Sequence, residues 1–103
     1  MTEYTYEIEM QTLIGVKYGT MHAEVSGKEV KGVLHLMKQS TSFCGRIDEN
    51  GDCIIRGEII SLTKTIPYQA AGRMTKGAVL LDMYTNQGQF HITGKETHHE
   101  EIL

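Results

Sequence analysis

The chain has 103 residues, 40% of them hydrophobic and 22% charged, which predicts one globular domain, residues 1–103, with a single core. A formal net charge of −3 at pH 7, with ten Lys and Arg residues spread along the sequence, disfavours nucleic acid as a partner. No apolar run approaches the ~20 residues of a membrane span, and the N-terminal residues lack the features of a secretory signal. We therefore expect a cytoplasmic location and no membrane partner.

The hydrophobic pattern predicts β-strands along the whole chain and no substantial helix, because no stretch carries an apolar stripe at helical spacing. Residues 4–10 alternate, with Tyr4, Tyr6, Ile8 and Met10 on one face and Thr5, Glu7 and Glu9 on the other. Further strands are predicted at 17–26, 29–38, 42–48, 53–63, 65–71, 74–84 and 88–96. Turn residues separate them at Gly15, Ser26–Lys28, Gln39–Thr41, Asn50–Gly51, Ala71–Arg73 and Asn86–Gly88.

One stretch of the sequence occurs twice. Gly27–Leu36 recurs 45 residues later as Gly72–Leu81, and in both copies Lys-Gly precedes an apolar run. We interpret each copy as a tight turn that leads into an apolar strand. This interpretation predicts a protein made of two similar four-stranded halves.

Three hairpins predict a consistent strand register. A loop at Gly27-Lys28 pairs Val25 with Val30, Ala23 with Gly32 and Met21 with Leu34, and it sets Glu24 against Lys31 on the other face. A loop at Asn50–Asp52 pairs Ile47 with Ile55, Gly45 with Gly57 and Phe43 with Ile59. A turn at Gln87 pairs Met83 with Phe90 and Leu81 with Ile92, and it leaves Asp82 opposite His91 outside. Each hairpin separates an apolar face from a more polar one. Without a helix to cover the apolar face, the sheet must close, which predicts an all-β, eight-stranded antiparallel up-and-down barrel.

The predicted interior is apolar and contains glycine. Its inward side chains are Tyr6, Ile8, Met10, Met21, Val25, Leu34, Leu36, Phe43, Ile47, Ile55, Ile59, Tyr68, Val79, Leu81, Phe90 and Ile92, with Gly32, Gly45, Gly57, Gly77 and Gly94 on the same face. The glycines either let the strands coil around a narrow barrel, which we favour, or leave room for a ligand. Because no charged residue clearly faces inward, an interior ligand should be small, neutral and apolar, held by hydroxyls such as those of Tyr6, Tyr68 or Ser61. The candidate ligand-binding residues are Tyr6, Met10, Leu36, Phe43, Tyr68, Met83 and Phe90, below a mouth formed by the loops at Gly15, Gln39, Lys64 and Gln87.

Several segments carry a family resemblance. They are Thr12–Gly15, Gly19-Thr20, Phe43–Asp48 with Asn50-Gly51, Ile66–Gly72 and Gly88–Gly94, and through them residues 4–96 resemble small uncharacterised bacterial proteins of the calycin-like type. The resemblance implies an eight-stranded meander barrel related in architecture to lipocalins and fatty-acid-binding proteins, which carry small apolar ligands. The chain lacks the Trp of the lipocalin Gly-x-Trp motif and the helical lid of the fatty-acid carriers.

No set of residues in the sequence predicts catalysis, a metal site or a cofactor. His22, His35 and His91 are expected outside, at separate places, and His98-His99 lie in a polar tail, 97–103, expected to be frayed. Cys44 is expected outside and Cys53 inside or at a turn, out of register for a disulfide and without a base beside either. Asp48, Glu49 and Asp52 surround the Asn50-Gly51 turn and are expected to stabilise it rather than to bind calcium.

One surface feature predicts a protein interface. The candidate interface residues are Ile54, Ile60, Leu62, Pro67, Ala78 and Leu80, all expected outside as one apolar patch unless the tail residues Ile102 and Leu103 cover it. Two functions therefore stay open for a non-enzymatic barrel. The first is a carrier or sensor of a small apolar molecule, and the second is an interaction module that forms a homodimer around a solid interior.

Overall fold

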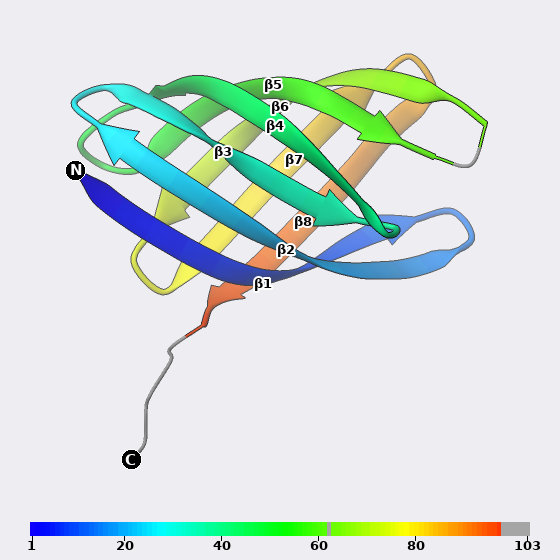
Figure 1. The fold of residues 1–103 in the computed structure, drawn as a ribbon, viewed down its shortest axis with the longest axis horizontal. Coiled ribbons are helices and arrows are strands. Elements are labelled where there is room, and N and C mark those ends of the chain that lie inside the picture. Colours follow the sequence, from blue (N-terminus) through cyan, green and yellow to red (C-terminus); the bar gives the residue numbers. More distant parts are fainter. Residues whose placement is uncertain (62, 98–103) are drawn as a thin grey trace.

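The computed structural model describes residues 1–61 and 63–97 of the chain. Eight strands form one closed barrel in which each strand is antiparallel to its neighbours in sequence and β8 pairs with β1 (Figure 1). The strands are β1 (Thr2–Thr12), β2 (Gly15–Ser26), β3 (Glu29–Leu36), β4 (Gln39–Ile47), β5 (Asp52–Ile60), β6 (Thr65–Thr75), β7 (Ala78–Thr85) and β8 (Gly88–Glu96). No helix among the described residues is long and apolar enough to cross a membrane. The predicted fold class, an all-β up-and-down barrel, is confirmed.

Alternation along each strand decides which side chains form the core. In β1 the side chains of Tyr6, Ile8 and Met10 are buried, whereas Glu7 and Glu9 between them are exposed. All side chains predicted to face inward lie in the core, with Val25 and Phe90 at its partly buried margin. The register predicted for the β2–β3 and β7–β8 hairpins is confirmed pair by pair.

The register predicted for the β4–β5 hairpin is wrong by two residues. Ile47 pairs with Cys53 rather than Ile55, Gly45 with Ile55 rather than Gly57, and Phe43 with Gly57 rather than Ile59. The turn begins one residue earlier than predicted because Asp48 organises it: its Oδ1 accepts the N–H of Asn50 at 2.8 Å and of Asp52 at 3.1 Å. A shift of two residues leaves every side chain on its predicted face.

The turn predicted at Ala71–Arg73 is also wrong, because β6 continues through it to Thr75 and the chain turns at Lys76-Gly77. Gly72 lies within the sheet, opposite Leu81, where a Cβ would contact the Leu80 carbonyl. Gly77 is an exposed turn residue with φ of 102° and does not face inward. The two copies of the repeated stretch therefore occupy different places, since Gly27 lies in a turn and Gly72 in a strand.

The turn predicted at Gln39–Thr41 lies earlier, at Met37-Lys38, and Gln39 already pairs with Leu36. Met37 and Lys38 have φ of 53° and 66°, the geometry of a mirror-image hairpin turn that usually carries Asn-Gly. Because Met and Lys occupy these positions, the local sequence carries no turn signal there.

Glycines let the strands pass close to one another in a flattened barrel, whose principal extents are 39 × 33 × 18 Å. A Cβ on Gly32 would contact the His22 carbonyl, and one on Gly45 the Ile54 carbonyl. The neighbouring backbone therefore occupies the space that a side chain at either position would need, as expected for tight coiling of the strands.

Candidate functional site

The hydroxyl of Tyr68 is the one buried side-chain polar atom without a hydrogen-bond partner in the described part of the chain. Tyr68 faces inward from β6, is 5% exposed and lies opposite Gly57 on β5. A Cβ built on Gly57 would lie 2.8 Å from this hydroxyl oxygen, so the missing side chain of Gly57 makes room for it. Burial raises the pKa of Tyr68 far above its usual value, with a smaller contribution from Cys44. The phenol is therefore a neutral hydrogen-bond donor at physiological pH.

The second buried phenol, Tyr6, differs from Tyr68 because its hydroxyl is satisfied. It donates to the Thr75 carbonyl at 2.6 Å and so ties β1 to the β6–β7 turn across the barrel. Burial is the main cause that raises its pKa, followed by Tyr4, Glu96 and Cys53. The Tyr6 hydroxyl thus stabilises the fold through a hydrogen bond, whereas the Tyr68 hydroxyl has no partner among the described residues.

The remaining candidate ligand-binding residues line the interior. Met10, Leu36, Phe43 and Met83 are buried, and Phe90 is half-buried against the core. Ser61, expected to offer a hydroxyl to a ligand, instead closes the β5–β6 loop, where its Oγ and the Lys64 backbone exchange hydrogen bonds of 3.2 and 3.3 Å.

Sequence reasoning missed how many methionines the interior holds. Met10, Met21, Met74 and Met83 are each at most 3% exposed. Their unbranched, polarisable side chains adapt to the shape of a neighbour at low cost. No polar or charged residue is buried among the described residues. The interior therefore offers an apolar, adaptable environment with one free hydroxyl.

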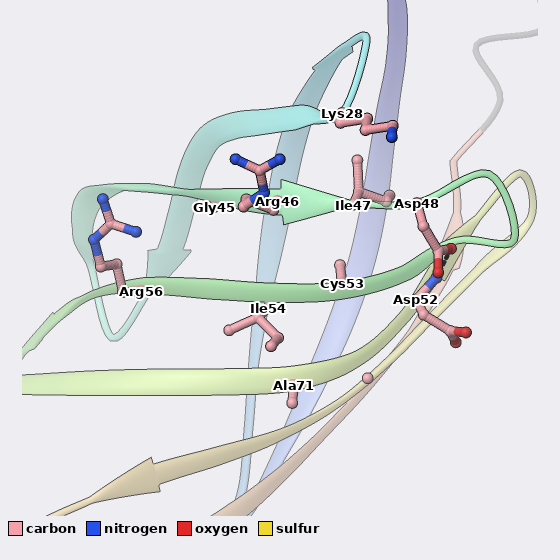
Figure 2. A pocket seen from close by; sticks show the side chains of 11 residues that line it. Lys28, Gly45, Arg46, Ile47, Asp48, Asp52, Cys53, Ile54, Arg56 and Ala71 are labelled. Carbon is pink, nitrogen blue, oxygen red and sulfur yellow. Dashed lines mark hydrogen bonds between the residues drawn. The ribbon is translucent and has the colours of Figure 1, made fainter.

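The outer wall carries open grooves, and two of them contain candidate interface residues. One of about 660 Å³ runs over β4, β5 and β6, and Figure 2 shows Arg46, Ile54, Arg56 and Ala71 along it. A second, of about 900 Å³, crosses β2, β1, β8 and β7 and includes Leu80. These grooves separate the candidate interface residues.

The predicted apolar patch is divided. Ile54, Pro67, Ala78 and Leu80 are exposed and Ile60 is half-buried, while Leu62 and the tail residues 98–103 lie outside the described residues. Ile54 lines the first groove, whereas Ala78 and Leu80 line the second. Pro67 lies opposite Glu58, and Leu80 lies opposite Arg73, whose Nε is 3.2 Å from Asp52 Oδ1. Charged side chains thus interrupt the surface that the sequence predicted as continuous.

His22, His35, His91 and the two cysteines lie where the sequence predicted, whereas His98 and His99 lie outside the described residues. On the outer face, each of these three histidines forms a hydrogen bond through its Nδ1 atom. The partners of His22, His35 and His91 are Thr5 Oγ1 at 3.0 Å, Ser40 Oγ at 2.6 Å and Asp82 Oδ1 at 2.8 Å, respectively. Within the described ranges, no three His, Cys, Asp or Glu side chains gather as a metal site would require. Cys44 is exposed and Cys53 buried, and both are free thiols. Burial, assisted by Asp52 and Asp48, raises the pKa of Cys53 to about 11.

The described side chains offer one buried hydroxyl without a partner, a methionine-rich interior and open grooves on the outer wall. This arrangement can hold a neutral molecule or another protein surface by noncovalent contact. No protein-family model matches this chain, and no curated protein or solved structure matches it either.

Proposed function

We propose that this protein is a cytoplasmic, non-enzymatic binding protein that holds a small, neutral, largely apolar molecule inside the barrel. The Tyr68 hydroxyl is the polar anchor and donates to an acceptor atom of the ligand, such as a carbonyl or ether oxygen. The observation that carries the proposal is the buried Tyr68 hydroxyl without a partner among the described residues. Leaving such a group unsatisfied costs about 1–3 kcal/mol, and a bound acceptor removes that cost.

The character of the interior supports the proposed class of ligand. Met10, Met74 and Met83 can change rotamer to admit a guest, which a core of branched side chains does less readily. No charged residue is buried in the described part of the chain, and the half-buried Lys17 and Glu96 lie near the barrel ends, at inward register positions opposite Met10 and Tyr6. An ionic group held within the core would therefore remain unpaired. A neutral ligand has no such cost.

Native mass spectrometry of the protein purified from its own cells tests the proposal. We expect the wild-type protein to retain a small molecule, and Tyr68→Phe to lose it because the anchor is gone. Tyr6→Phe is the matched control, since its hydroxyl already bonds to Thr75. Bare wild-type protein, or equal retention in all three proteins, would contradict the proposal.

A second candidate function is self-association through the outer wall. It is favoured by the groove over β2, β1, β8 and β7, because Tyr18 and Leu80 on that groove are 70% and 51% exposed. Leu80→Glu should then give monomers in sedimentation, whereas Ile54→Glu, in the other groove, should leave a dimer intact. Equal masses for both variants and the wild type would refute this interface.

A further inference from the structure

The apex of the β1–β2 hairpin carries two exposed aliphatic side chains. Leu13 is 99% exposed and Ile14 85% exposed, and Val16 beside them is 37% exposed. In Figure 1 this hairpin projects at the right-hand side of the barrel, beyond the neighbouring β3–β4 turn. Exposure of two adjacent large aliphatic residues at a tip is unfavourable in water unless another surface covers them.

The turn itself does not require these side chains, and the chain contains its own comparison. In Thr12–Gly15 the Thr12 hydroxyl donates to the Gly15 carbonyl at 2.6 Å and accepts the Ile14 N–H at 3.3 Å. Thr85–Gly88 repeats this arrangement with bonds of 2.9 Å to the Gly88 carbonyl and 3.0 Å from the Gln87 N–H. The two glycines have nearly equal φ, 127° and 130°.

The second turn carries Asn86 and Gln87 at the positions that Leu13 and Ile14 occupy in the first. The same backbone therefore forms with polar residues at its tip. Folding of the hairpin does not explain why the first tip is aliphatic.

The end of the barrel that holds both turns also carries positive charge. We call it the Leu13 end; the meander brings the β1–β2, β3–β4, β5–β6 and β7–β8 connections together there (Figure 1). The segments 10–17, 35–42, 59–66 and 84–90 hold three of the ten basic residues, Lys17, Lys38 and Lys64, and none of the thirteen acidic residues. In a chain of net charge −3, this end is therefore locally cationic.

Lys38 and Lys64 are exposed, whereas Lys17 is half-buried near the end of β2, at an inward register position opposite Met10. None of the ion pairs within the described ranges includes Lys17, Lys38 or Lys64. The nearest carboxylates along the strands, Glu9 and Glu58, lie on the outer walls, where they pair across the sheet with Tyr18 and Pro67. An approaching anionic surface therefore meets lysines and apolar side chains before it meets acidic groups.

We propose that the Leu13 end docks onto an anionic lipid surface, with Leu13 and Ile14 inserted among the lipids and the three lysines facing the headgroups. The aliphatic tip projects from the barrel, and a fluid lipid layer accommodates a projection without a complementary groove. Lys38 and Lys64 lie in separate connections and Lys17 lies near the start of β2, so the charge is distributed over this end, as contact with an extended charged plane requires. The expectation of no membrane partner depended on the length of apolar runs, and surface docking needs no such run.

The test uses cosedimentation with vesicles of phosphatidylcholine mixed with phosphatidylserine, compared with vesicles of phosphatidylcholine alone. We expect the wild-type protein to bind the mixed vesicles, to bind them less as salt is added, and to bind the neutral vesicles weakly. Each lysine near an anionic surface contributes about fivefold in partition, so Lys17→Gln/Lys38→Gln/Lys64→Gln should lose roughly a hundredfold.

Two matched variants separate this contact from nonspecific effects. Lys28→Gln/Lys76→Gln/Lys95→Gln removes the same charge from elsewhere on the barrel and should keep most of the binding. Leu13→Asn/Ile14→Gln copies the polar tip of the Asn86-Gln87 turn, so the hairpin should fold while binding falls at least about a hundredfold.

Three results would overturn the proposal. They are wild-type protein that stays in the supernatant with the mixed vesicles, equal losses in the two lysine triples, and a Leu13→Asn/Ile14→Gln variant that binds as the wild type does. If that variant changes the oligomeric mass but not vesicle binding, the tip is a protein interface instead. Thermal unfolding of each variant checks that it is folded.

Discussion

The Tyr68 hydroxyl lies against Gly57 on the adjacent strand, at a distance of 2.8 Å from the position a Gly57 Cβ would take. The glycine provides the space that the phenol occupies, yet it offers no side chain to pair with the hydroxyl. A phenylalanine at position 68 would fit the same space without an unsatisfied polar atom. Comparing the free energies of unfolding of the wild type and Tyr68→Phe therefore measures what the unsatisfied hydroxyl costs in stability.

Tyr68→Phe should stabilise the ligand-free protein by about 1 kcal/mol, because it removes a buried hydroxyl that has no partner. Tyr6→Phe should destabilise it by about 1–2 kcal/mol, because it removes the hydrogen bond to Thr75. Urea unfolding of the two variants measures both values. A loss of stability in Tyr68→Phe would mean that the hydroxyl already has a partner and would remove the basis of the proposed site.

Gly57→Ala should destabilise the protein by about 1–3 kcal/mol, because the new methyl group would press on the Tyr68 hydroxyl and the Ser42 carbonyl. Tyr68→Phe removes the first of these contacts but not the second, so the double variant should recover part of the loss. A double-mutant cycle gives the coupling energy, and strictly additive effects would show that the two residues do not interact.

Alkaline pH should destabilise the fold, and ionisation of the Cys53 thiol should determine the pH at which this loss of stability begins. The pKa of Cys53 is about 11 in the folded chain against a reference value of 9.0, so the unfolded chain loses this proton first. The contribution of the Cys53 thiol to the free energy of unfolding is fully present below pH 9. It is lost as the pH rises to about 11, which lowers the stability by about 2–3 kcal/mol. Ionisation of Tyr6 and Tyr68, whose pKa values burial also raises, extends the loss to higher pH.

Unfolding measured between pH 9 and pH 11 checks this expectation, with Cys53→Ala as the comparison. The variant should be less stable at neutral pH because it loses packing, but it should show a smaller decrease across this window. The same slope in both proteins would assign the pH dependence to other groups.

Iodoacetamide labelling of the native protein should modify the exposed Cys44 and spare Cys53.

Lys38→Gly should stabilise the protein by about 1 kcal/mol, because Lys38 has φ of 66°, a conformation that glycine adopts without steric cost. The residue is exposed and its side chain makes no described ion pair, so little is lost with it. Thermal unfolding gives the sign of the change. Lys28→Gly is the control, because Gly27 already takes the positive φ in that turn, and this variant should bring no such gain.

The sequence by itself determined which side chains face the core. Period-two alternation places Leu34, Ile55 and Leu81 inside whatever the exact register, because an error of two residues, as at β4–β5, preserves the face. The same alternation gives the sheet one apolar face, and the sequence predicts no helix to cover it. The sheet must therefore curl so that its apolar face is enclosed. Closure of the barrel therefore followed from local pattern alone.

Only the tertiary structure decided what individual residues do. Gly27 and Gly72 begin similar segments, but one supplies a positive φ in a turn and the other lets two strands approach, since a missing side chain serves either purpose. Tyr6 and Tyr68 both alternate inward, and only the fold gives one hydroxyl the Thr75 carbonyl and leaves the other without a partner. Likewise, Leu13, Lys38 and Lys64 are far apart in sequence and share one end only because the meander returns there. Such roles depend on contacts between distant segments, which local pattern does not encode.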